Sequence, residues 1–96
     1  MYALFITFTL GPGMRSTAEK MADQFALVHR TAKGFTSGTF LGDDAVGEYG
    51  SLTLWESKED VDAFSEIARP QLEKALSGIA KGPPSRRVFE VYEPKV

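Results

Sequence analysis

The chain lacks cysteine altogether and has a single histidine, His29, among its 96 residues. Without cysteine it has no disulfide scaffold, no thiolate zinc site and no cysteine nucleophile. One histidine also argues against a metal site built from imidazoles. We therefore expect no metal and no other cofactor, which leaves cofactor-free or carboxylate chemistry.

Long hydrophobic runs are absent as well. No stretch approaches the roughly 20 apolar residues that span a bilayer. Residues 2–10 have the apolar character of a secretion signal, but no basic residue precedes them, Thr7 and Thr9 interrupt them, and no small-x-small cleavage site follows. The run is typical of a β-strand, so we expect a cytoplasmic protein with no membrane partner.

Excess positive charge is the third feature that is missing. The formal net charge is −2, with acidic residues concentrated in residues 43–66 and basic residues in 67–87. This balance argues against binding a phosphate backbone, so we expect no nucleic-acid partner. With 43% hydrophobic and 25% charged residues, the composition is that of a globular protein. A length of 96 residues is typical of one domain, so we expect residues 1–96 to form a single domain.

Hydrophobic periodicity predicts six elements in the order β-α-β-β-α-β. Alternating side chains predict strands over residues 2–9, 35–41, 48–56 and 87–93. Apolar side chains spaced by three and four predict helices over residues 16–33 and after Ser57, the second with a kink or interruption at Pro70. Ser16 with Glu19, and Ser57 with Asp60, have the spacing of capping boxes.

This order predicts an α+β fold of the ferredoxin-like type, a four-stranded antiparallel sheet with both helices on one face. Strict alternation along the second strand places Phe35 and Leu41 on one face and Phe40 on the other. Apolar side chains occur on both faces of the sheet strands, and a monomer would expose several hundred Å² of apolar surface. We therefore predict a homodimer that forms through the sheet face.

Two motifs carry a resemblance to a known family. Gly34-Phe35 opens the second strand, and residues 51–57 (SLTLWES) run from the third strand into a capped helix. In these segments the chain resembles the antibiotic biosynthesis monooxygenases, which are dimeric α/β barrels. The resemblance covers nearly the whole chain and implies a pocket between each sheet and its helices, without fixing a substrate.

The haem-degrading branch of that family is a poor match. That branch has an asparagine on the first strand, a tryptophan inside the second helix and a histidine ten residues later. Here the corresponding positions are Leu4 or Ile6, Phe64 and Lys74. The resemblance therefore disfavours haem degradation and favours the oxygenase branch, whose members oxidise a polycyclic phenol with dioxygen and use no metal or flavin.

His29 is the candidate general base, because it is the only side chain whose ordinary pKa lies near neutrality. The alternative is a charged histidine that merely stabilises the end of the first helix. Trp55 is either a pocket wall and indole donor to a ligand, or a core residue where a strand meets a helix. Phe64, about two turns into that helix, borders the same expected pocket.

Tyr49 and Tyr92 are candidates to orient a phenolic ligand, with packing at a sheet or dimer face as the alternative. Arg69 could neutralise an acidic ligand or an oxyanion, or simply lie at a solvated rim. We expect a small apolar or aromatic ligand and a cofactor-independent monooxygenase of an aromatic or quinol-type molecule. The alternative is a non-catalytic dimeric module of the same fold that binds a small ligand.

Overall fold

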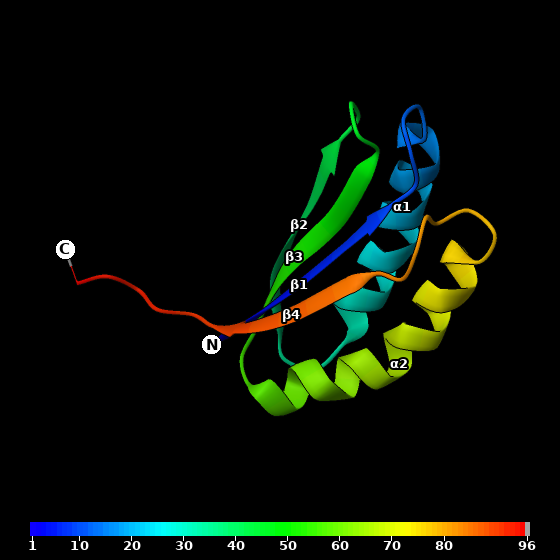
Figure 1. Ribbon diagram of the computed structural model, residues 1–96. Helices are drawn as coiled ribbons and strands as arrows, with labels where there is room; N and C mark the ends of the chain where they lie inside the picture. Colours follow the sequence, from blue (N-terminus) through cyan, green and yellow to red (C-terminus); the bar gives the residue numbers. More distant parts are fainter. Residues whose placement is uncertain (96) are drawn as a thin grey trace.

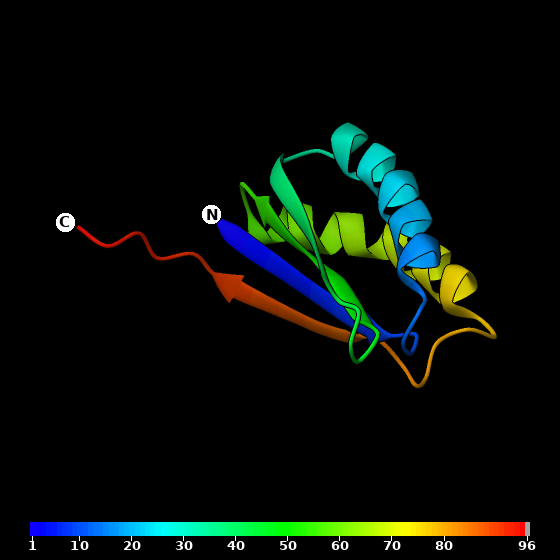
Figure 2. The same cartoon turned by 90° about the horizontal axis from the view of Figure 1, so that it is seen from above.

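The computed structural model describes residues 1–95 and shows the six elements in the predicted order (Figure 1). The strands are β1 (Tyr2–Thr9), β2 (Phe35–Asp43), β3 (Glu48–Trp55) and β4 (Ser85–Glu90), and the helices are α1 (Arg15–Thr31) and α2 (Lys58–Leu76). The strands form one antiparallel sheet in the order β2-β3-β1-β4. Figure 2 shows both helices on the same face of this sheet, which confirms the ferredoxin-like fold.

The last strand is shifted from its predicted range of residues 87–93. β4 pairs with β1 from Ser85, opposite Thr7, to Glu90, opposite Tyr2. The ladder ends there because β1 begins at Tyr2, and one further hydrogen bond joins the Val91 N–H to the Met1 carbonyl at 3.0 Å. The alternation of side chains in the sequence continues beyond the end of the partner strand. For this reason the predicted strand extends to residue 93, whereas β4 ends at Glu90.

A β-bulge in β2 corrects the predicted alternation. The register between β2 and β3 shifts between Phe35 and Ser37, so Thr36 is an extra residue in β2. One extra residue inverts the side-chain pattern that follows it. Phe40 therefore lies on the same face of the sheet as Phe35, the face that carries the helices, and the prediction of opposite faces was wrong.

The two predicted helix caps have different outcomes. The Ser57 hydroxyl accepts a hydrogen bond from the Asp60 N–H at 3.1 Å, which confirms the cap of α2. α1 instead begins at Arg15, with Met14 at the cap position and no side-chain cap, so the cap predicted at Ser16 was wrong. The turn after β1 is complete by residue 14, and Ser16 consequently falls inside the first helical turn.

Helix α2 continues through Pro70 instead of ending there. Proline lacks the N–H that the helix needs and crowds the preceding turn, so it bends a helix that tertiary packing preserves. Figure 1 shows α2 changing direction along its length, with its final turns rising beside α1. Within residues 1–95, neither this helix nor α1 is long and apolar enough to cross a membrane.

The core lies between the sheet and the two helices. Trp55 is its centre, with 0% exposure, and its indole N–H donates to the Thr53 hydroxyl at 2.8 Å. Leu4, Val61 and Phe64 pack around it. A second cluster lies toward the other end of the sheet and contains Leu10, Met21, Tyr49 and Leu76.

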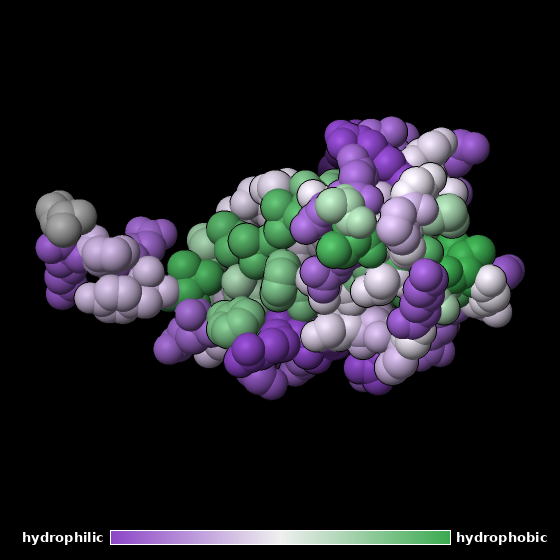
Figure 3. Space-filling model, turned by 45° about the horizontal axis from the view of Figure 1, so that its top comes forward, coloured by the Kyte–Doolittle hydropathy of each residue, from purple (hydrophilic) through white to green (hydrophobic). Residues whose placement is uncertain are grey.

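The opposite face of the sheet has no helix over it (Figure 2) and carries exposed apolar side chains, with the Arg87 guanidinium 4.6 Å from the centre of the Phe89 ring. Leu52 lies opposite Phe5 in the ladder between β3 and β1, on the side away from Trp55 and Thr53. Leu41, Leu52 and Phe89 are exposed, by 46%, 38% and 41% respectively. Figure 3 shows apolar side chains gathered over the strands. We call the surface formed by Phe5, Leu41, Leu52, Leu54 and Phe89 the open sheet face.

Candidate functional site

A cavity of about 590 Å³ lies between the helix-covered face of the sheet and the two helices. Its size falls within the range of small-molecule sites in proteins. Leu4, Ile6 and Phe8 of β1 line it from the sheet, and α1 contributes Met21 and Phe25. The lining is thus largely apolar, with polar groups at a few defined places.

His29 extends from the last turn of α1 into the aromatic wall of this cavity. Its ring stacks on Phe35 and Phe40 at centroid distances of 5.5 and 5.9 Å. Phe64 is tilted against it at 5.0 Å, and Trp55 meets it edge-on at 6.4 Å. His29 is only 5% exposed, and this burial lowers the pKa of its imidazole below the ordinary value of 6.5.

The lowered pKa of His29 bears on its protonation state. Desolvation favours the neutral imidazole, which is a proton acceptor at neutral pH. A charged histidine stabilising the helix terminus is therefore not the state that this site favours.

Trp55 lies behind the cavity wall. Its ring packs on Phe64 at 4.7 Å, and Phe64 lines the cavity, whereas Trp55 is not among the lining residues described. Its N–H is already engaged with Thr53. Trp55 therefore supports the wall from within the core.

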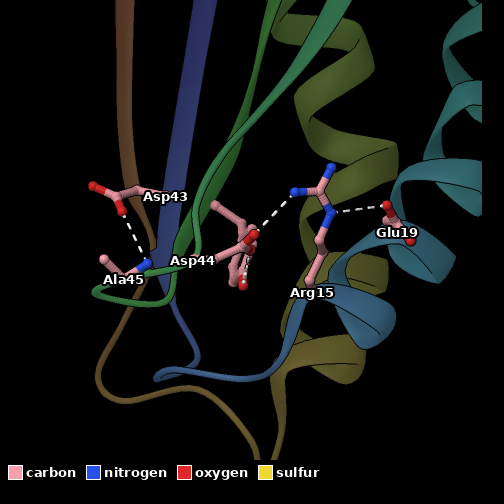
Figure 4. Close-up of polar contacts among 6 residues, drawn as sticks. Arg15, Glu19, Asp43, Asp44 and Ala45 are labelled. Atoms are coloured by element: carbon pink, nitrogen blue, oxygen red, sulfur yellow. Dashed lines mark hydrogen bonds and ion pairs between the residues drawn. The ribbon is translucent and has the colours of Figure 1, made fainter.

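A polar network lines the end of the cavity where the β2–β3 turn lies near α1 (Figure 4). The Arg15 guanidinium donates to Asp44 Oδ2 at 2.9 Å and to Glu19 at 3.1 Å. The Tyr49 hydroxyl donates to Asp44 Oδ1 at 2.8 Å. The bond from Arg15 lowers the pKa of Asp44, while burial and then the bond to Asp44 raise the pKa of Tyr49.

A second polar position lies between α2 and β4. The Arg86 guanidinium donates to the Ser65 hydroxyl at 2.8 Å, and both residues line the cavity. Arg69 of α2 also lines it from an exposed position.

Of the site residues predicted from the sequence, His29, Phe64, Tyr49 and Arg69 meet at this one cavity. Tyr92 is 79% exposed on the segment after β4 and is not among the lining residues described. Sequence reasoning missed Arg15 and Asp44, although the spacing of Arg15 and Glu19 by four residues is a signal for that half of the network. Within residues 1–95, no group of three histidine, aspartate or glutamate side chains is placed to hold a metal ion.

No protein-family model and no curated protein matches the chain. Solved structures do match it. The ActVA-Orf6 monooxygenase of Streptomyces coelicolor, in complex with nanaomycin D, is 21% identical and superposes with a TM-score of 0.77 over 99% of this chain and 90% of that chain.

Two further structures show what this fold accommodates. SnoaB, a cofactor-independent oxygenase from Streptomyces nogalater, is 16% identical, with a TM-score of 0.74 over 97% of this chain and 94% of its own. MhuD, with two manganese protoporphyrin IX molecules per active site, is 20% identical, with a TM-score of 0.75 over 100% and 99% of the two chains. The chain therefore has the fold of the antibiotic biosynthesis monooxygenases, as the resemblance implied.

Proposed function

We propose that the chain is a cofactor-independent monooxygenase that oxidises an aromatic or quinol-type small molecule with dioxygen. The observation that carries the proposal is the apolar cavity with a neutral imidazole, that of His29, in its aromatic wall. The fold shared with ActVA-Orf6 and SnoaB supports the same class of reaction.

In the proposed reaction, His29 takes a proton from an activated C–H group beside a phenol or ketone of the substrate. The resulting delocalised anion transfers electrons to dioxygen, and a carbon–oxygen bond forms. The peroxide that results loses water, so a CH₂ group becomes C=O, one oxygen atom enters the product and the other leaves as water. The substrate supplies all four electrons, and the proton held by His29 leaves with the water.

Oxygen consumption with an anthrone, whose CH₂ group can become C=O, tests this activity. We expect the rate to rise with pH through a pKa below 6.5, because burial lowers the pKa of His29. His29→Gln should reduce the rate by roughly 10² or more, since glutamine keeps a polar side chain but cannot accept the proton. Tyr92→Phe is the matched control and should leave the rate unchanged, because Tyr92 lies outside the cavity lining.

Two outcomes would count against the proposal in different ways. Full activity of His29→Gln with an unchanged pH profile would remove the base assignment alone. If no phenol, anthrone or quinol gave oxygen uptake above the uncatalysed rate, the proposal of an enzyme would be wrong. A non-catalytic dimeric module that binds a small ligand would then be the better explanation.

The proposal includes a homodimer and a cytoplasmic location. The exposed apolar side chains of the open sheet face support dimerisation through that face. Residues 2–9, the segment with the apolar character of a secretion signal, form β1, which pairs with both β3 and β4 in the middle of the sheet. This central position supports the prediction that the segment is a β-strand of the folded protein and not a secretion signal.

A further inference from the structure

The hydroxyl proton of Tyr49 is committed to a partner inside the protein. It points to Asp44 Oδ1 at 2.8 Å, and Asp44 Oδ2 accepts from Arg15 at 2.9 Å. The bond from Arg15 keeps the pKa of Asp44 low, so this carboxyl group is ionised at neutral pH. An ionised carboxylate can only accept hydrogen bonds, and the direction of the bond between Tyr49 and Asp44 is therefore fixed.

The ring that carries this hydroxyl is also fixed in place. Tyr49 is 6% exposed and belongs to a buried cluster with Leu10 and Met21. It lies opposite Gly42 in the ladder, where an added Cβ atom would come within 2.8 Å of Tyr49 Cδ1. Because Gly42 has no side chain, the ring of Tyr49 can occupy this space.

Tyr49, Asp44 and Arg15 all line the cavity, so a ligand meets this network at the end formed by the β2–β3 turn. A tyrosine hydroxyl has one proton to donate and lone pairs that accept. With the proton given to Asp44, only a lone pair remains for a ligand.

We propose that Tyr49 is a specificity residue that acts toward the ligand only as a hydrogen-bond acceptor. The turn end of the cavity then selects an aromatic ligand with a hydroxyl group at that position over one with an alkyl or carbonyl group. Asp44 is the positioning residue, and Arg15 holds its second carboxylate oxygen in place at 2.9 Å. This inference rests on the proposed function only in that the cavity takes an aromatic molecule.

The test compares two neutral ligands of similar size, 2-naphthol and 2-methylnaphthalene, by equilibrium dialysis at pH 7. The measured quantity is the ratio of their dissociation constants in each variant, which removes the general difference in hydrophobicity between them. Tyr49→Phe should shift this ratio against the naphthol severalfold, up to roughly tenfold, which corresponds to the net value of one hydrogen bond.

Asp44→Ala provides a second, independent variant on the surface. It frees the Tyr49 proton for donation, so the affinity for 2-acetylnaphthalene, which offers a carbonyl acceptor, should rise severalfold relative to the wild type. Asp62→Ala is the matched control: Asp62 also forms an exposed ion pair, with Lys58 at 3.4 Å, but is not among the lining residues described, so its removal should leave the affinity for 2-acetylnaphthalene at the wild-type value.

An unchanged ratio in Tyr49→Phe, with both naphthalenes still bound by a correctly folded protein, would overturn the role of Tyr49 and leave the proposed function standing. Unchanged affinity for 2-acetylnaphthalene in Asp44→Ala would overturn the role of Asp44 in fixing the proton. Failure of the wild type to bind any of the three ligands would overturn both this inference and the ligand-binding cavity on which the proposed function depends.

Discussion

Burial of His29 makes the folded state sensitive to acid. The pKa of His29 is below 6.5 in the folded protein, and the unfolded chain has the ordinary value near 6.5. Below that value the unfolded state binds more protons than the folded state, so the free energy of unfolding falls as the pH falls. The contribution of His29 is complete above the unfolded pKa and is lost as the pH drops toward the folded pKa.

Urea unfolding of wild type and His29→Gln at pH 7.5 and 5.0 measures this effect. We expect the wild type to lose more of its free energy of unfolding between these values than the variant does. Asp44 does not contribute within this window, because its pKa is lowered from 3.8 and its stabilisation is lost only at more acid pH. If the wild type gained stability relative to His29→Gln between pH 7.5 and pH 5.0, the result would instead indicate a charged histidine that stabilises the helix terminus.

At the scale of single elements, the two serine residues near the helix starts form a natural pair for comparison. Ser57→Ala removes a cap from α2, and we expect the free energy of unfolding to fall by about 1 kcal/mol. Ser16→Ala should change it by no more than about 0.5 kcal/mol, because Ser16 lies on the exposed surface of the first turn of α1. Thermal or urea unfolding measures both, and equal losses would contradict the cap assignments.

The strand β2 shows which features of the fold hydrophobic periodicity cannot predict. The order and types of all six elements follow from hydrophobic periodicity, since apolar side chains recur at the spacing of a strand or of a helix in each of them. The bulge at Thr36 has no signature in that periodicity, because it depends on the register with β3. The stacking of Phe35 and Phe40 on His29 therefore could not be predicted, although His29 itself could be placed on α1.

The polar network of the cavity was beyond prediction for a similar reason. Arg15 and Asp44 are 29 positions apart and meet only because the β2–β3 turn folds toward the start of α1. Local spacing reports on helix neighbours such as Arg15 and Glu19, whereas contacts between separate elements require the complete topology.

At the scale of the whole molecule, the open sheet face determines the expected assembly. Sedimentation should show a dimer of the 10.5 kDa chain, with an interface above roughly 1,200 Å² in total. Leu52→Glu places a charge on this face and should weaken dimerisation on the order of tenfold or more. Leu27→Glu, on the exposed surface of α1, is the matched control and should leave the dimer intact.

A monomeric wild type at micromolar concentration would contradict the dimer. Dissociation by Leu27→Glu with no effect of Leu52→Glu would place the interface on the helices instead. The topology behind this expectation was available from the order of elements, but the exposed fractions that make Leu52 a good probe come only from the folded structure.

Trp55 gives the protein a built-in optical reporter. It is the only tryptophan, it is fully enclosed, and its neighbour Phe64 forms part of the cavity wall. An indole so shielded from water fluoresces at short wavelength, and an aromatic guest that absorbs in that band would quench it by energy transfer. The occupancy of the cavity can thus be followed in the unlabelled protein, with the emission wavelength reporting at the same time whether the core is still dry.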